Sequence, residues 1–176
     1  MIQDFTTERL HVRKMTASDA TELFKIWSDP VVTQFMNIEN MTEEKQAIDI
    51  INYLGNLADE NKAIRYSIIE RNTNKIIGSC GYNSLDFENS KCEIGYEIAH
   101  QYWGKGYASE AISMLLENAF NNLNLNRVEA KVEIDNVASV KVLQKLNFTY
   151  EGTLRQTEKS KGRFIDLQIF SKLQSD

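Results

Sequence analysis

The stretch Trp103-Gly104-Lys105-Gly106-Tyr107-Ala108 decides how this chain is expected to fold, because it joins a strand-like segment to an amphipathic one. Gly104 and Gly106 have no Cβ atom, so the backbone there can adopt positive φ and approach a ligand closely. The first amides of the following helix have no partner within it, and the helix dipole adds about half a positive charge at this end. The sequence therefore predicts an anion site, suited to a pyrophosphate, where the loop meets the helix.

Two familiar phosphate-binding loops do not fit this stretch. A Walker A loop requires Ser or Thr directly after its Gly-Lys pair, whereas Gly106 follows Lys105. A dinucleotide-binding fingerprint requires a third Gly where Ser109 stands. Neither type of nucleotide-binding fold is predicted.

The stretch resembles instead the coenzyme A loop of the GNAT acyltransferase superfamily, Gln/Arg-x-x-Gly-x-Gly/Ala, with Gly106 and Ala108 in the two small positions. Trp103 stands where Gln or Arg is usual, and a Trp there resembles the RimJ/RimL branch, whose named members acetylate protein N-termini. Two further segments resemble the same family in the same order along the chain. They are the opening Thr7-Glu8-Arg9-Leu10 and the motif Asn136-Val137-Ala138-Ser139.

This resemblance extends over about residues 7–170 and implies an N-acetyltransferase that passes the acetyl group of acetyl-CoA directly to a primary amine. In the family, a backbone amide near the position of Ile98 polarises the thioester, and the motif Asn bonds the pantetheine arm. The cofactor contacts that the resemblance implies are Ile98, Trp103, Gly104, Lys105, Gly106, Tyr107, Ala108, Asn136 and Ser139.

The catalytic residues that the resemblance implies are Glu158 as general base and Ser139 beside the departing thiolate. Glu97, Glu93 or a water molecule are alternatives to Glu158, which also fits an ordinary solvated charge. Many relatives place a Tyr seven residues after the motif Asn, but Leu143 stands there. Ser139 is therefore expected to stabilise the thiolate by a hydrogen bond, and the competing interpretation is an ordinary serine of a first helical turn.

The pKa of the acceptor nitrogen bears on which kind of amine the enzyme would use. An α-amine, with a pKa of about 7.7–8.0, needs less help from a base than a lysine or polyamine nitrogen of about 10.4, which favours a protein N-terminus. A small amine such as a polyamine or an aminoglycoside is the alternative, and a non-catalytic acyl-CoA-binding module is a third hypothesis. Trp27, Phe35 and Met36 are candidate acceptor contacts.

Composition is that of one domain over residues 1–176, because 42% of the residues are hydrophobic and nothing resembles a linker. The net charge of −5 argues against a nucleic-acid partner, and no segment is apolar enough to cross a membrane. The start, Met1–Asp4, does not resemble a secretory signal, so we expect a cytoplasmic monomer or homodimer whose partner is the amine acceptor. Cys80, Cys92 and His100 lack the spacing of metal ligands, and no metal is predicted.

Hydrophobic periodicity predicts an α/β protein of the α+β type, and the resemblance specifies the GNAT acyl-CoA N-acyltransferase fold. The expected architecture is a central, mixed, mostly antiparallel sheet of about seven strands flanked by about four helices. Thr16 and Asp19 are expected to form a capping box at the first helix, and Pro30 to end that segment. Two buried thiols are expected on neighbouring strands, where Cys80 and Cys92 would face each other.

Overall fold

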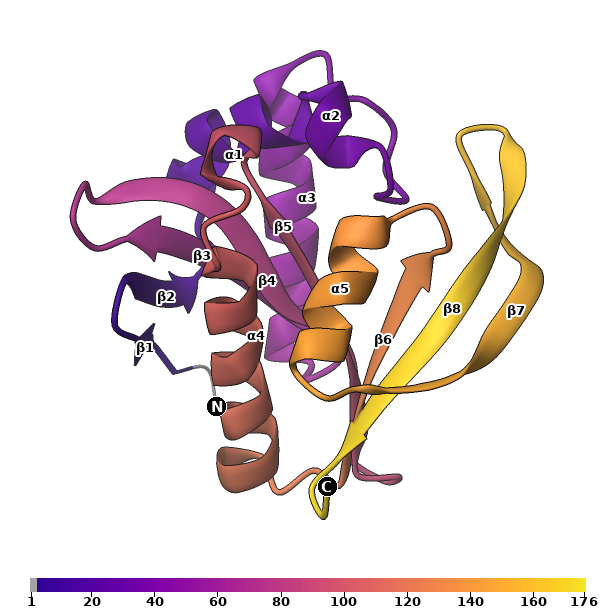
Figure 1. Ribbon diagram of the computed structural model, residues 1–176. Coiled ribbons are helices and arrows are strands. Elements are labelled where there is room, and N and C mark those ends of the chain that lie inside the picture. Colours follow the sequence, from indigo (N-terminus) through magenta and orange to yellow (C-terminus); the bar gives the residue numbers. More distant parts are fainter. Residues whose placement is uncertain (1–2) are drawn as a thin grey trace.

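The computed structural model describes residues 3–176, so the first two residues of the expected domain and of its N-terminal segment lie outside it. The described chain forms one eight-stranded sheet in the order β1-β2-β3-β4-β5-β6-β8-β7 (Figure 1). The strands are β1 (Phe5–Thr6), β2 (Leu10–Lys14), β3 (Ile64–Glu70), β4 (Lys75–Asp86), β5 (Lys91–Ile98), β6 (Arg127–Glu133), β7 (Thr149–Ser160) and β8 (Arg163–Leu173).

Neighbouring strands are antiparallel except β5 and β6, which are parallel. The expected mixed, mostly antiparallel sheet is therefore confirmed. It has one strand more than the seven expected, because β1 has only two residues and these carry no periodic pattern.

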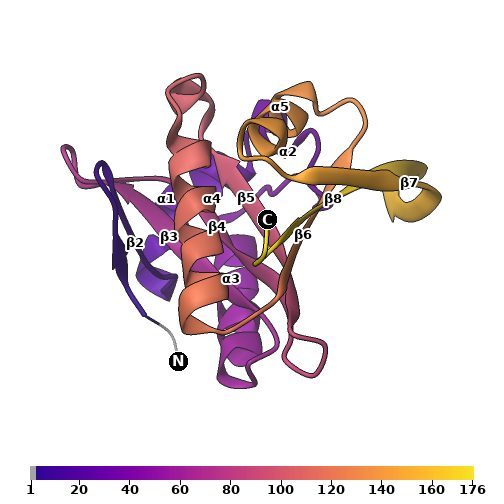
Figure 2. The same cartoon turned by 60° about the horizontal axis from the view of Figure 1, so that its bottom comes forward.

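Five helices flank the sheet within residues 3–176, and they cover both of its faces. Figures 1 and 2 show α4 and α5 on one face, with α1 and α3 on the other. Pro30 does more than end the first helical segment, because it begins the short α2, where a missing N–H costs nothing. The helices are α1 (Ala20–Trp27), α2 (Pro30–Thr33), α3 (Glu44–Asp59), α4 (Tyr107–Glu117) and α5 (Val137–Lys145).

Two apolar clusters fill the spaces between these layers. The larger cluster joins the sheet to α4 and α5 and contains Ile112, Leu115 and Leu143, each fully buried. The smaller cluster joins α1 to α3 through residues such as Leu23 and Ile51. The apolar stripe that periodicity predicts for α4 thus faces the core.

A carboxylate fixes the start of α1, as expected from the capping box. Asp19, at the end of a 3-10 turn (Ala17–Asp19), accepts a hydrogen bond from the Thr16 amide at 3.0 Å. The same carboxylate accepts from the Arg13 guanidinium at 2.8 Å and from the Ser67 hydroxyl at 2.7 Å. This buried group therefore joins α1 to β2 and β3.

The two cysteines do not face each other across the β4–β5 ladder. Cys80 lies opposite Tyr96, and Cys92 lies opposite Leu85. Both are buried free thiols, and burial raises the pKa of each to about 12. The structure therefore gives them the properties of inert core residues.

The parallel pair β5–β6 is short, and its end positions the candidate site. The ladder joins Lys91–Ile94 to Arg127–Ala130 and stops there. Beyond that point residues 95–98 of β5 pair with β4 alone. Figure 1 shows the two strands diverging, with α5 lying over the region between them. Backbone groups on this side of β5 are consequently left without a strand partner.

Candidate active site

The loop before α4 turns the chain through two residues with positive φ. Gly104 has a φ of 72° and Gly106 a φ of 81°, and a residue with a Cβ atom is disfavoured there by roughly 1–2 kcal/mol. A Cβ added at Gly104 would meet nothing within 4 Å, so the glycine serves the backbone conformation and not the space around it. Gly106 is the N-cap of α4, one residue before the helix begins.

The turn leaves a row of backbone amides without a hydrogen-bond acceptor in the described chain. Within residues 3–176, the amides of residues 104–109 donate to no acceptor, and the first hydrogen bond back into the turn runs from Glu110 to the Gly106 carbonyl, at 3.1 Å. Consecutive free N–H groups at a helix N-terminus suit a pyrophosphate. The residues present therefore fit the phosphate end of coenzyme A.

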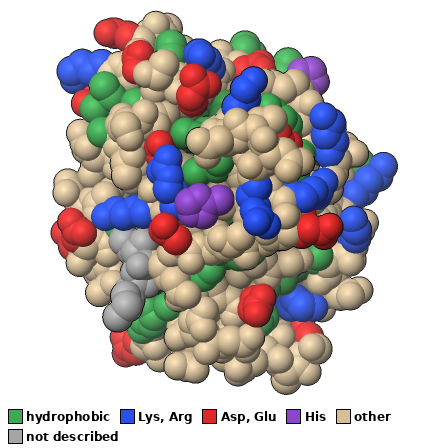
Figure 3. Space-filling view, turned by 90° about the vertical axis from the view of Figure 1, so that its left-hand side faces the viewer, with side chains coloured by type: hydrophobic (Ala, Val, Ile, Leu, Met, Phe, Trp, Pro, Cys, Tyr) green, Lys and Arg blue, Asp and Glu red, His purple; other side chains and the backbone are tan. Residues whose placement is uncertain are grey.

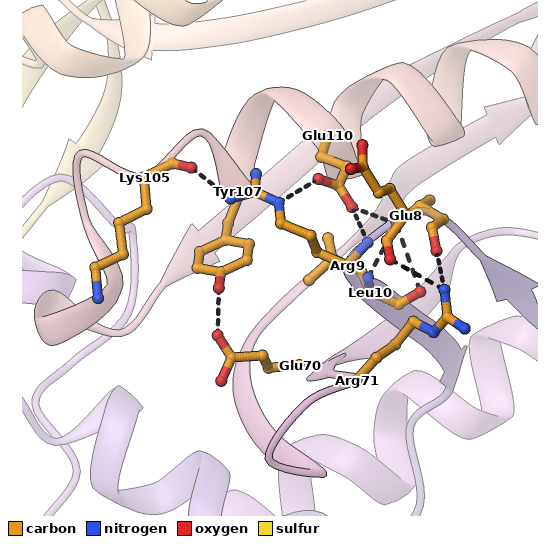
Figure 4. Close-up of polar contacts among 9 residues, drawn as sticks. Glu8, Arg9, Leu10, Glu70, Arg71, Lys105, Tyr107 and Glu110 are labelled. Atoms are coloured by element: carbon orange, nitrogen blue, oxygen red, sulfur yellow. Dashed lines mark hydrogen bonds and ion pairs between the residues drawn. The ribbon is translucent and has the colours of Figure 1, made fainter.

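Arg9 holds this loop from the N-terminal strands, as Figure 4 shows. Its guanidinium donates to the Lys105 carbonyl at 2.8 Å and lies 4.3 Å from the centre of the Tyr107 ring. Glu110 accepts from the Arg9 side chain at 2.8 Å and from the Arg9 amide at 2.9 Å. The Thr7–Leu10 segment thus braces the anion loop directly, so the loop shape does not depend on its glycines alone.

Tyr107 adds a second brace, because its phenol donates a hydrogen bond to Glu70 at the end of β3 (Figure 4). This bond holds the pKa of Glu70 below its ordinary value.

The net charge of the chain is −5, yet Lys and Arg side chains form a band across the side that carries β1 and β2 (Figure 3). The negative net charge is therefore not spread evenly over the surface of the protein.

Trp103 ties the loop to the end of β5. Its indole N–H donates to the Ile98 carbonyl at 2.7 Å, and its ring packs edge-on against His100 with centroids 4.7 Å apart. The neighbouring Ala99 amide donates to the Ile77 carbonyl of β4. Because alternate amides of a strand point in opposite directions, the Ile98 amide faces the region where β6 has diverged.

The first turn of α5 carries the second predicted motif. Asn136 is the N-cap of this helix, and its side-chain oxygen accepts from the Ser139 amide at 3.3 Å. The Ser139 side chain is almost buried, and its hydroxyl shares a hydrogen bond with the phenol of Tyr96 on β5. Leu143, where relatives carry a phenol, is fully buried in the core. Sequence reasoning did not anticipate Tyr96, although it alternates with Cys92 and Ile94 on the α5 side of the strand.

The predicted alternative base Glu97 lies on the opposite face of the sheet. It is buried and accepts from the Trp27 indole at 2.8 Å, as well as from Ser79 and Arg65. Both carboxylate oxygens are therefore engaged, and Trp27 is buried with them. Glu97 and Trp27 thus belong to one buried, hydrogen-bonded group beneath the end of β5.

Glu158 lies on β7, half-buried, and accepts a hydrogen bond from the Asn37 side chain at 3.2 Å. The same β7–β8 hairpin sends the Lys161 ammonium to the carbonyls of Thr33, at 2.7 Å, and Met36, at 2.6 Å. These contacts join the hairpin to the segment after α2, where the acceptor side chains were expected. The structure thus joins Glu158 to Asn37, the residue after Met36, although Glu158 and Asn37 are distant in sequence.

Two further carboxylates, Glu93 and Glu133, lie on the same face of the sheet as Glu97. Sequence reasoning did not anticipate Glu133. Glu93 pairs with Lys131 at 3.1 Å. Glu133 ends β6, is buried, and has Arg163 as its partner at 3.5 Å within the described part of the chain. Burial raises the pKa of Glu133, the nearby Arg163 lowers it, and Glu158 adds to the rise. Glu133 also lines a cavity of about 200 Å³ at the end of β6.

Within residues 3–176, no helix is long and apolar enough to span a membrane. In the same part of the chain, no group of three or more His, Cys, Asp or Glu side chains is arranged to hold a metal ion.

Comparison with known proteins agrees with the geometry. The family model of the acetyltransferase (GNAT) domain matches residues 9–149. The uncharacterized N-acetyltransferase p20 of Bacillus licheniformis is 49% identical over 170 residues, which are 97% of this chain and 96% of that protein. The ribosomal-protein-serine acetyltransferase of Escherichia coli (strain K12) is 27% identical over 99 residues, 56% of this chain and 55% of that protein.

A solved structure of RimL, a ribosomal L7/L12 alpha-N-protein acetyltransferase in complex with coenzyme A, has a TM-score of 0.90. The superposition covers 99% of this chain and 100% of that one, and at 21% identity it supports the fold alone. GNAT acetyltransferases use acetyl-CoA. The matched domain and the relative that is similar over nearly the whole length show that this chain belongs to the GNAT family of N-acetyltransferases.

Proposed function

We propose that this enzyme acetylates the N-terminal α-amine of a protein, with acetyl-CoA as the donor. The observation that carries the donor half is the row of free amides at residues 104–109, held open by Gly104 and Gly106. The acceptor half is supported by the likeness to a ribosomal-protein-serine acetyltransferase.

The donor would lie on the α4–α5 face of the sheet. The loop amides would bind its pyrophosphate. The side-chain amide nitrogen of Asn136 would donate to its pantetheine arm, and the backbone amide of Ile98 would donate to the acetyl oxygen. The Ser139 hydroxyl would lie near the sulfur. Each of these groups is on an element that borders the region where β5 and β6 diverge.

The acceptor would approach from the opposite face, and Glu158 is the proposed base. An α-amine with a pKa of about 7.7–8.0 is already partly neutral at pH 7, so a half-buried carboxylate acting directly or through water is a sufficient base. Glu158 also adds to the rise in the pKa of Glu133, after burial and Asp135.

The charges on this face give a polyamine acceptor no specific support. Glu93 is neutralised by Lys131, and Glu133 faces Arg163. Lys161 adds a further cation on the hairpin. The side chains around the proposed acceptor site therefore carry charges of both signs, whereas a polyamine needs a strongly acidic surface.

The test measures release of free thiol from acetyl-CoA with three sets of acceptors: short peptides with free N-termini, polyamines and aminoglycosides. Turnover on peptides supports the proposal, and turnover on small amines alone overturns the proposed acceptor. Calorimetric titration with coenzyme A runs beside it, and a lack of binding would overturn the donor site as well.

Glu158→Gln tests the base, with Glu117→Gln on the exposed side of α4 as the matched control. We expect Glu158→Gln to lower kcat by about 100-fold at unchanged affinity for coenzyme A. Glu117→Gln should retain full activity. Equal activity of the two variants would remove Glu158 from the mechanism.

A further inference from the structure

Tyr96 lies at the point where β5 leaves β6. Cys92, Ile94 and Tyr96 alternate onto the face covered by α4 and α5, and they contact the same apolar cluster. The parallel ladder ends at Ile94. Tyr96 is therefore the first side chain on the donor face beyond the ladder, two residues before Ile98.

The phenol of Tyr96 reaches the first turn of α5. Its one hydrogen-bond partner within residues 3–176 is the hydroxyl of Ser139, and that hydroxyl has no second partner there. Burial raises the pKa of Tyr96, although the bond to Ser139 acts in the opposite direction, so the phenol stays protonated at neutral pH. A phenol is a stronger acid than an aliphatic hydroxyl, which makes Tyr96 the donor and Ser139 the acceptor.

This direction leaves the Ser139 proton without an acceptor in the described chain. A hydroxyl that accepts a hydrogen bond also donates more strongly, because the two bonds polarise each other. The Ser139 proton is thus both free and strengthened, on the helix turn where Asn136 is proposed to bind the pantetheine arm.

We propose that Tyr96 is a positioning residue for acetyl transfer, which orients the Ser139 hydroxyl so that it donates to the departing sulfur. This inference rests on the proposed function, because it assumes that the thioester of acetyl-CoA lies beside Ser139. As the amine nitrogen bonds the acetyl carbon, the carbon–sulfur bond breaks and its electron pair stays on sulfur. The amine proton goes to the base, and the thiolate is stabilised by the Tyr96–Ser139 pair until it takes a proton from water.

The arrangement also supplies the phenol that α5 lacks. Leu143 follows Ser139 by one helical turn and fills the core. A Tyr there would have to displace core packing, whereas Tyr96 reaches Ser139 from the strand. The hydroxyl pair therefore places a phenol in contact with Ser139 without a change in the packing of Leu143.

Kinetics of single and double variants test this role. Tyr96→Phe removes only the hydroxyl and should lower kcat about tenfold, less than the loss of a direct proton donor. Ser139→Ala should lower kcat to a similar extent, and the double variant should be no slower than Ser139→Ala. The KM for acetyl-CoA should stay within about twofold, since the pair acts on the charge that develops during transfer. Tyr150→Phe, at an exposed tyrosine hydrogen-bonded to Thr153, is the control and should be unchanged.

A second measurement needs no acceptor. The thiol pKa of bound coenzyme A, read from the ultraviolet absorbance of its thiolate, should be about one unit higher in Tyr96→Phe than in the unmodified protein, which corresponds to tenfold weaker stabilisation. A purely structural tie between β5 and α5 would lower thermal stability and leave this pKa unchanged.

The outcomes separate the two proposals. Turnover on small amines alone would overturn the proposed acceptor, while the two measurements would still judge Tyr96. An unchanged thiol pKa, or losses in kcat that multiply in the double variant, would overturn the role of Tyr96 with the proposed function intact. A lack of coenzyme A binding would overturn both.

Discussion

Gly106→Ala is the sharpest test of the donor loop, because the structure separates conformational strain from crowding at this position. The φ of Gly106 is 81°. An added Cβ would lie 3.4 Å from the Arg9 guanidinium, an ordinary contact with a flexible side chain. The cost of the substitution is therefore the cost of holding alanine in the left-handed region, roughly 1–2 kcal/mol.

This strain appears in folding or in binding, depending on what the free loop does. If the loop keeps its shape, the melting temperature should fall by roughly 2–8 °C, given about 2–4 °C per kcal/mol for a chain of this size. If the free loop relaxes, the strain returns on binding and the Kd for coenzyme A rises by about 5–30-fold. The two losses, expressed as free energies, should add up to the strain.

Scanning calorimetry and calorimetric titration with coenzyme A measure the two parts on the same protein. Gly55→Ala is the matched control, because Gly55 lies within α3 on the other face of the sheet and an added Cβ there meets nothing within 4 Å. It should stabilise the protein by about 0.5–1 kcal/mol without changing the Kd. The reasoning is refuted if Gly106→Ala alters neither the melting temperature nor the Kd.

Three further predictions concern the core. Burial raises the pKa of Asp19, but Arg13 holds it below its ordinary 3.8. The contribution of this ion pair to the free energy of unfolding is therefore present above about pH 4 and is lost as the pH falls through the lowered pKa. Asp19→Asn should cost about 3–5 kcal/mol in urea unfolding at pH 7, and a cost under 1 kcal/mol would contradict a buried pair. Cys80 and Cys92 should react with a thiol reagent only after unfolding, so rapid labelling of the native protein would contradict their burial. Leu143→Ala should lower the free energy of unfolding by about 2–5 kcal/mol, whereas a surface position would lose almost nothing.

The sequence predicts the regular elements well where one side of an element is apolar and the other is not. α4 is the clearest example, because Ile112 and Leu115 recur at helical spacing and are both fully buried. The two-residue β1 is too short to show a period, and α2 begins at a proline that also fits a simple helix end. These two elements form because of the residues that they pack against, and a local sequence pattern carries no information about those tertiary contacts.

The geometry of the proposed donor loop was predictable for a different reason. Its glycines and its Trp103 lie in one continuous loop, and each is required by local backbone geometry or by contact with Ile98. Tyr96 could not be assigned in the same way, since any buried strand tyrosine looks alike until its partner is known. Only the end of the β5–β6 ladder brings it to Ser139.

The proposed donor groups are easier to predict from the sequence than the proposed acceptor groups. On one face, the proposed donor groups follow each other along β5, the loop and α5, within residues 96–139. On the other face, the groups that we propose to border the acceptor come from distant segments, such as Asn37 after α2, Glu133 on β6 and Glu158 on β7. A motif can record the first set because its members share one stretch of chain. The second set is brought together only by the long β7–β8 hairpin, so acceptor specificity has to be read from tertiary contacts such as those of Lys161.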